Sequence, residues 1–144
     1  MKTTIENILK NKGNQTYSVA PNDSVFEAVK KMADHEIGAV IVLVGNELVG
    51  ILSERDCARK IILSDKKSTD TSVKDVMTKE VYCAIGSSTV QECLEIMNKK
   101  KFRHLPITED GQVIGMISIK DLVNKIIEDQ QSTIDYLETY IKRG

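Results

Sequence analysis

The sequence predicts an α+β fold of two β-α-β-β-α repeats packed with pseudo-twofold symmetry, with an additional helix at each end of the chain. The segment from Gly50 to Asp56 recurs from Gly115 to Asp121, an offset of 65 residues that continues in both directions without a gap. β-Branched runs alternate with amphipathic segments in the same order in both halves. A small sheet with one apolar face needs a covering layer, so we expect the two repeats to pack on each other.

The first helix of each repeat is predicted from its start. Ser24 and Thr89 are each followed three residues later by a glutamate, which is the pattern of a capping box. Apolar residues then recur at helical spacing, which predicts a buried stripe on each helix. The stripe residues are Val25, Ala28, Val29 and Met32 in the first repeat and Val90, Cys93, Leu94 and Met97 in the second. We also expect Phe26, Phe102 and the methionines in the core.

Two strands and a second helix complete each repeat. Residues 39–44 and 104–108 are rich in apolar and β-branched side chains, which favours strands. Gly45-Asn46 and Asp110-Gly111 are hairpin-type pairs, and they precede the second strands, residues 48–53 and 113–118. We expect a long helix after each hairpin.

A second register, with an offset of 68 residues, relates residues 3–9 to residues 71–77, so a short helix precedes each repeat. We divide the chain into a first repeat with its N-terminal helix (1–64), a polar linker (65–71), a second repeat (72–128) and a C-terminal helical tail (129–144). In the tail, apolar residues at helical spacing predict packing or dimerisation. These residues are Ile134, Leu137, Tyr140 and Ile141.

Composition limits the classes of function. The formal net charge is −1, so no basic surplus favours nucleic acid, and any bound phosphate must meet a few placed cations. The longest apolar run has six residues and the N-terminus lacks an apolar signal core, so we expect a cytoplasmic protein outside the membrane. Cys57, Cys83 and Cys93 are expected to be reduced and mostly buried, and His35 and His104 are too few for a histidine metal centre.

The element order and the doubled Gly-x-x-Ser-x-x-Asp motif resemble the cystathionine-β-synthase (CBS) domain family. The segments 53–60 and 103–106 add to this resemblance, which covers nearly the whole chain, from about Ile5 to Ile127. It implies a non-catalytic regulatory module with no catalytic cofactor. Such a module binds AMP, ADP, ATP, NAD or S-adenosylmethionine in the cleft between the repeats and signals occupancy to a downstream partner. The resemblance also implies a homodimer formed through helices, and we expect the tail to contribute.

The resemblance assigns ribose or phosphate contacts to the serine and aspartate of each motif, which are Ser53, Asp56, Ser118 and Asp121. It assigns phosphate contacts to the residues before the Leu-Pro step, Arg103 and His104. The first repeat has Gly38 and Ala39 at those positions, so the two clefts are expected to differ.

The chemistry of these residues agrees with such roles. A serine at a strand end and an aspartate in the next helical turn face the same mouth as the free N–H groups of the helix. A carboxylate can accept hydrogen bonds from both ribose hydroxyls, and guanidinium groups suit phosphate. We expect adenine to lie against Gly38, Ala39 and Ile107, and phosphate to meet Arg55, Arg59, Arg103 and Lys120.

Simpler interpretations remain open for each motif. Ser-x-x-Asp is also an ordinary helix cap, and of the two aspartates we favour Asp121 as the ligand group. Arg103 and His104 are adjacent, so on a regular strand they face opposite sides, unless Pro106 makes the strand start irregular. The run of lysines at 99–101 is typical of a solvated helix end.

Two other functions are considered besides ligand sensing. A purely structural dimerisation module without ligand would have the same fold. A relative of the regulatory part of IMP dehydrogenase would place the repeats beside an enzyme. The sequence shows no nucleophile with a base, no metal cluster and no phosphate-binding P-loop, so we predict no catalytic activity and no metal site.

Overall fold

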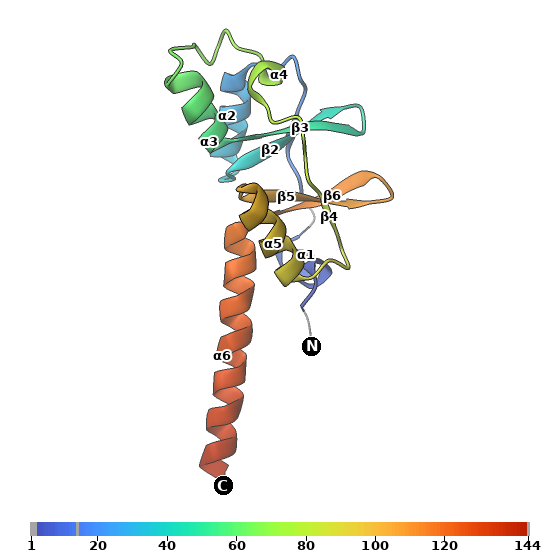
Figure 1. Cartoon of the computed structure of the whole chain (residues 1–144), viewed down its shortest axis with the longest axis vertical. Coiled ribbons are helices and arrows are strands. Elements are labelled where there is room, and N and C mark those ends of the chain that lie inside the picture. Colours follow the sequence, from blue (N-terminus) through green and yellow to red (C-terminus); the bar gives the residue numbers. More distant parts are fainter. Residues whose placement is uncertain (1–2, 14, 144) are drawn as a thin grey trace.

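The computed structural model describes residues 3–13 and 15–143, with the side chains of all of these except 136 and 139–143. Each repeat forms a three-stranded sheet covered by helices, and a long C-terminal helix extends away from the two sheets (Figure 1). The first repeat contains β1 (Ser18–Val19), α2 (Val25–Asp34), β2 (Ala39–Val44), β3 (Glu47–Ser53) and α3 (Glu54–Cys57), which continues into a π-helical turn (Ala58–Ile62). The second contains β4 (Ala84–Ile85), α5 (Val90–Lys100), β5 (His104–Glu109), β6 (Gln112–Ser118) and α6 (Ile119–Arg143).

The two sheets have the same topology and the same register. In each, the central strand pairs parallel with the short first strand and antiparallel with the third. Ala39 pairs with Ser53 as His104 pairs with Ser118, which reproduces the offset of 65 residues. Gly45 and Asp110 adopt positive φ in the hairpin turns, as the glycine and aspartate in the sequence predict. The predicted α+β fold of two similar repeats is confirmed.

The predicted caps set the starts of α2 and α5. The Ser24 hydroxyl accepts a hydrogen bond from the Glu27 backbone N–H at 3.1 Å, and Thr89 accepts one from Glu92 at the same distance. Each bond satisfies an N–H group that has no partner within the helix. Both helices therefore begin immediately after these residues.

Each short preceding helix packs into the core of the other repeat. Ile5, Ile8 and Leu9 of α1 (Ile5–Lys12) are buried in the core of the second repeat. Val73 and Val76 of α4 (Val73–Val76) are buried in the core of the first. Symmetrical backbone hydrogen bonds hold the exchange, because the Ile5 N–H donates to Ser88 O at 2.9 Å and the Val73 N–H donates to Asp23 O at 2.8 Å. Each hydrophobic core therefore combines the strands and helices of one repeat with the short helix that precedes the other repeat.

The second helices of the two repeats differ, and the expectation of two long helices is wrong for the first. There the helical segment ends at Ile62, because the polar linker must turn back to bring α4 onto the first core, and Asp65 in this linker has a φ of 54°. In the second repeat α6 continues unbroken for 25 residues and includes the predicted tail. Tyr140 and Ile141 of the predicted tail stripe lie outside the described side chains.

The predicted core is confirmed in part. Val25, Ala28, Met32, Val90, Cys93 and Met97 are buried. Phe26 and Val29 are exposed, because α2 packs on its sheet through Val25, Ala28 and Met32 and turns the adjacent side chains outward. Cys57 and Cys93 are buried as expected, whereas Cys83 is exposed. Phe102 is only partly buried.

The exchange of helices predicts that a mutation in α1 destabilises the second repeat. Ile5→Ala removes a fully buried side chain, and we expect it to lower the free energy of unfolding by about 2–5 kcal/mol. Urea denaturation followed by circular dichroism measures this change. Glu6→Ala on the exposed side of the same helix is the control, with an expected change within about 0.5 kcal/mol. Equal stability of both variants would contradict the exchange.

Candidate functional site

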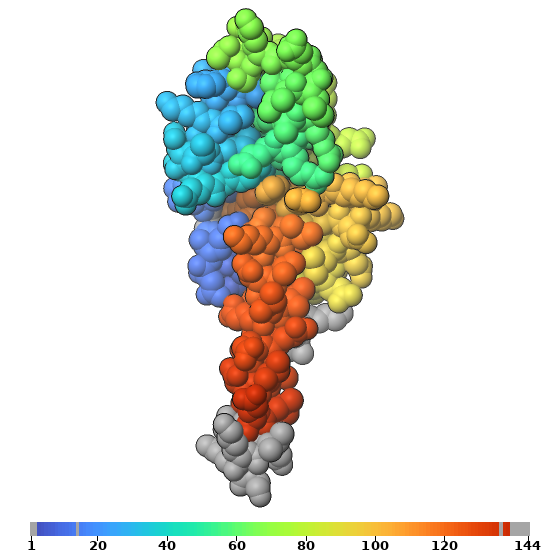
Figure 2. Space-filling view, turned by 90° about the vertical axis from the view of Figure 1, so that its left-hand side faces the viewer, coloured from blue at the N-terminus to red at the C-terminus, as the bar shows by residue number. Residues whose placement is uncertain are grey.

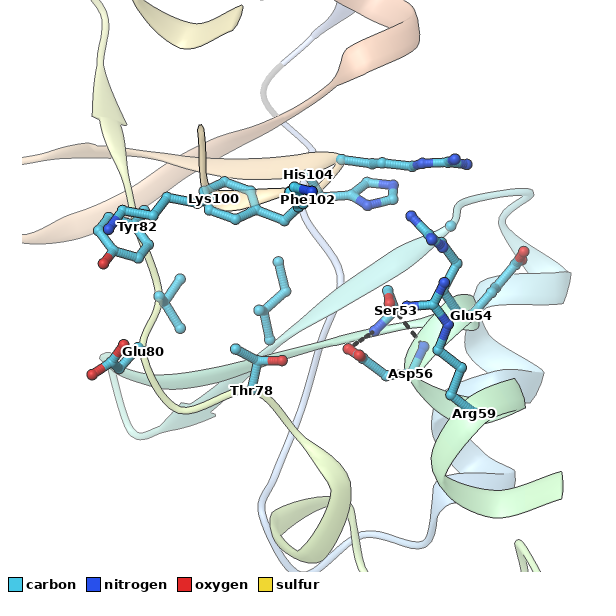
Figure 3. A pocket seen from close by; sticks show the side chains of 16 residues that line it. Ser53, Glu54, Asp56, Arg59, Thr78, Glu80, Tyr82, Lys100, Phe102 and His104 are labelled. Atoms are coloured by element: carbon cyan, nitrogen blue, oxygen red, sulfur yellow. Dashed lines mark hydrogen bonds between the residues drawn. The ribbon is translucent and has the colours of Figure 1, made fainter. Parts of the chain in front are cut away.

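A cleft of about 340 Å³ lies between the two repeats, within the usual size range of small-molecule sites (Figure 3). One side is formed by the end of β3 and the start of α3, and the opposite side by the end of α5 and the start of β5. The chain that leads from α4 toward β4 closes the remaining side. Its lining residues are Gly38, Ile51, Ser53, Glu54, Arg55, Asp56, Arg59, Thr78, Glu80, Val81, Tyr82, Lys100, Lys101, Phe102, Arg103 and His104.

Ser53 and Asp56 form a reciprocal helix cap at the edge of the cleft. The Asp56 backbone N–H donates to Ser53 Oγ at 3.1 Å, and the Ser53 N–H donates to Asp56 Oδ2 at 3.2 Å (Figure 3). The second carboxylate oxygen, Oδ1, is 4.0 Å from Lys60 Nζ. The cap interpretation is therefore confirmed, but it excludes no ligand role, since both side chains also line the cleft. The cap holds the carboxylate in a defined orientation.

Cationic side chains surround the same mouth. Five lysine and arginine side chains line the cleft against three carboxylates. The guanidinium of Arg103, followed by that of Arg59, lowers the pKa of Arg55, because like charges close together disfavour the protonated form. These three arginines come from both repeats, and an anion bound between them would relieve their mutual repulsion. The cleft is suited to a phosphate group.

An aromatic pair forms another part of the wall. Tyr82 and Phe102 stack with ring centroids 5.7 Å apart and an angle of 16° between the ring planes. The Lys100 ammonium lies 5.0 Å from the centroid of the Tyr82 ring. With Ile51 and Val81 these rings offer apolar surface of the kind that a planar base contacts.

Arg103 and His104 both reach the cleft although they are adjacent in sequence. β5 begins at His104, so Arg103 precedes the regular strand, and the alternation of strand side chains does not apply to it. His104 lies against Gly38 of the other repeat, where a Cβ atom would be 3.1 Å from His104 Nε2. Burial, followed by the nearby ammonium of Lys12, lowers the pKa of His104. The imidazole is therefore held in its neutral form over a wider pH range.

The motif of the second repeat lies outside this cleft. Asp121 makes the same cap with Ser118, but its Oδ2 also accepts a hydrogen bond from Lys12 Nζ at 2.6 Å. Burial alone would raise the pKa of Asp121, but the hydrogen bonds from Lys12 and Ser118 outweigh it and lower that pKa. Lys120 is exposed on the same turn.

Three further residues predicted at the site do not line the cleft either. Ala39, Pro106 and Ile107 are buried in the central strands, because β2 and β5 are covered on both faces. The structure thus brings together seven of the predicted residues: Gly38, Ser53, Arg55, Asp56, Arg59, Arg103 and His104.

The sequence analysis missed the wall that closes the cleft. Thr78, Val81 and Tyr82 lie in a segment with no periodicity, and Thr78 is held by paired backbone hydrogen bonds to Ile51 of 2.9 and 3.0 Å. Lys100 and Lys101 are at the end of α5, as predicted, but they also line the cleft. One signal was present in the sequence, since Tyr82 matches Tyr17 in the repeat alignment.

Two searches over the described residues bear on other kinds of site. No group of three or more His, Cys, Asp or Glu side chains in this part of the chain could hold a metal ion. None of its helices combines the length and the hydropathy that a membrane span requires.

Comparison with known proteins gives consistent matches along the chain. The CBS domain model matches residues 14–63 and 73–128. The mitochondrial CBS domain-containing protein CBSX3 of Arabidopsis thaliana is 34% identical over 151 residues, which cover 99% of this chain and 73% of that protein.

Solved structures show the same architecture. A putative signal-transduction protein with CBS domains from Burkholderia ambifaria is 42% identical, with a TM-score of 0.85 over 89% of this chain and 96% of that one. The CBS domain pair of protein MJ0100, in complex with 5′-methylthioadenosine and S-adenosyl-L-methionine, is 24% identical and shares the fold, with a TM-score of 0.77 over 86% and 99% of the two chains. Two repeats in one register, a cleft between them and these matches show that the chain belongs to the CBS-domain family, as a tandem pair of CBS repeats.

Proposed function

We propose that this chain is a non-catalytic regulatory module that binds an adenosine-containing nucleotide in the cleft between its CBS repeats. The observation that carries the proposal is the composition of that cleft. A capped carboxylate, an aromatic pair and a cluster of arginines line a single cavity of nucleotide size. The CBS pair of MJ0100, which has the same fold, was crystallised with two adenosine derivatives, and this supports an adenosine ligand here.

The geometry favours particular roles. Asp56 accepts hydrogen bonds from the ribose hydroxyls, since its cap fixes the carboxylate at the cleft edge. The base lies toward Phe102 and Tyr82. Arg55, Arg59 and Arg103 bind the phosphates, which favours AMP, ADP, ATP or NAD over the cationic S-adenosylmethionine.

Ligand occupancy reaches a partner through the relative position of the repeats. A nucleotide that contacts Asp56 and Arg103 at once touches both repeats, and so it stabilises the arrangement in which these residues are close. The ligand can change the affinity of a downstream protein for this chain only by as much as the ligand prefers one arrangement of the repeats over another. We also propose that the protein acts in the cytoplasm.

A homodimer formed through helices is also part of the proposal. Among the described side chains of α6, five apolar ones are exposed along one side of the helix: Ile119, Val123, Ile127, Ile134 and Leu137. Figure 2 shows this helix extending well beyond the two repeats. A second copy of the chain would bury the stripe. A purely structural dimerisation module is the second candidate function, and this stripe is the observation that favours it.

Ligand affinity tests the site. We expect Asp56→Asn to weaken AMP binding roughly 10- to 100-fold, because a charged acceptor of the ribose is lost. Isothermal titration calorimetry measures the dissociation constant, with Asp121→Asn as the matched control from the equivalent motif outside the cleft. Loss of affinity in the control alone would move the site to the second repeat. If the unmodified chain binds none of AMP, ATP, NAD and S-adenosylmethionine, the ligand-binding proposal is refuted. The structural dimerisation module is then the remaining candidate function.

The arginine cluster predicts a specific effect on phosphate. Arg103→Ala is expected to weaken AMP binding about tenfold while the affinity for adenosine, which has no phosphate, stays the same. Lys120→Ala, a basic residue outside the cleft, is the control and is expected to change neither affinity. Equal losses for AMP and adenosine would show that Arg103 does not meet phosphate.

The apolar stripe predicts the oligomeric state. Ile127→Lys places a charge in the middle of the stripe, and we expect it to convert a dimer into a monomer, because burial of an unpaired charge is costly. Size-exclusion chromatography with light scattering measures the mass. Ser132→Lys, on the opposite side of α6, is expected to leave the dimer intact. A monomeric unmodified chain would contradict this assignment.

A further inference from the structure

The ammonium of Lys12 occupies the mouth of the second CBS motif. Lys12 is the last residue of α1, and its Nζ donates to Met116 O at 2.7 Å and to Asp121 Oδ2 at 2.6 Å. Both acceptors are far away in the sequence, and both belong to the second repeat. The contact is made possible by the exchange of helices, which carries α1 onto that repeat.

The repeat alignment shows what this position means. Met116 and Asp121 correspond to Ile51 and Asp56 of the first repeat, since 116 − 65 = 51 and 121 − 65 = 56. Both counterparts line the nucleotide cleft. The Lys12 ammonium therefore lies between two groups whose equivalents border the ligand in the first motif.

The first motif has no such ammonium at the position equivalent to Lys12, which lies in the segment after α4, the helix that packs on the first repeat. The offset of 68 residues aligns Lys12 with Glu80 (12 + 68 = 80), and a carboxylate cannot form an ion pair with Asp56. Figure 3 shows Glu80 at the other end of the cleft from Asp56, beyond Thr78. One difference in charge between equivalent positions thus leaves Asp56 open to a ligand and pairs Asp121 within the chain.

The equivalent lysines Lys60 and Lys125 also differ in their contacts, so they do not give the two aspartates the same surroundings. Lys60 lies 4.0 Å from Asp56 and donates to Val76 O at 2.9 Å. Its counterpart Lys125 pairs instead with Glu128 at 3.6 Å and with Asp129 at 3.5 Å along α6. Asp56 thus has one lysine nearby, Lys60, which is 4.0 Å away and also donates to a backbone carbonyl. Asp121 instead accepts a direct hydrogen bond from Lys12.

We propose that Lys12 is an internal competitor that closes the second ligand motif, so that the chain binds nucleotide through the first cleft alone. The ligand class rests on the function proposed above. Ile5, Ile8 and Leu9 anchor α1 in the second core and hold the ammonium at a high effective concentration beside Asp121. The ion pair is partly exposed, with relative exposures of 40% and 23%, so removing the ammonium frees the carboxylate without leaving a buried charge.

Lys12→Met tests this proposal, because it removes the charge and keeps the aliphatic stem. We expect calorimetric titration with AMP to show one more bound molecule per chain than in the unmodified protein. We expect the second motif of Lys12→Met to bind AMP at least about tenfold more tightly than the second motif of the unmodified protein does. Lys12→Met combined with Asp121→Asn should return to the original stoichiometry. Lys10→Met, an exposed lysine on the same helix, is the control.

The outcomes separate this inference from the proposed function. If Lys12→Met binds no additional AMP while circular dichroism shows a folded chain, the competitor role is overturned, whatever the first cleft binds. Lys12→Ala repeats the test if the methionine variant misfolds. Two molecules of AMP per unmodified chain would overturn the role as well. Absence of AMP from the unmodified chain with one molecule in Lys12→Met would support the competitor and refute the first cleft as the site.

Discussion

The exchange of short helices between the repeats is the constraint on which the rest of this structure depends. The core beneath each three-stranded sheet includes side chains from the short helix that precedes the other repeat. Ile5 and Ile8 complete the second core, and Val73 and Val76 complete the first. Because each helix is joined to one repeat and buried in the other, the two sheets are held in one orientation. That orientation determines where the side chains around the cleft meet.

The cleft combines groups that serve local stability with groups that only the assembly brings together. Ser53 and Asp56 already stabilise the start of α3 as a cap, so their positions do not depend on a ligand. Arg103, Phe102 and Tyr82 come from the other repeat and from the connecting segment. A ligand in this cavity would therefore contact one half that local hydrogen bonds preorganise and one half whose position depends on the packing of the second repeat.

Duplication kept the backbone of the two motifs and changed their electrostatics. Strand register, hairpins and the Ser-Asp caps are the same in both halves, because they follow from backbone hydrogen bonds and short-range side-chain contacts. The charges that approach the two aspartates differ. Asp56 opens into a cavity with excess positive charge, whereas Asp121 is paired with Lys12. Residues outside the repeated motif thus give its two copies different electrostatic surroundings.

The amino-acid sequence by itself determined the doubled α+β fold, the helix caps, the hairpins and seven residues of the cleft, because these depend on periodicity and on contacts between near neighbours. It did not determine the exchange of α1 and α4, the aromatic wall of Tyr82 and Phe102, or the pairing of Lys12 with Asp121 across 109 residues. Such contacts join segments whose separation is set by the packing of whole repeats. Only the tertiary structure could decide that Asp56 lines a cleft between the repeats and that the Lys12 ammonium lies beside Asp121.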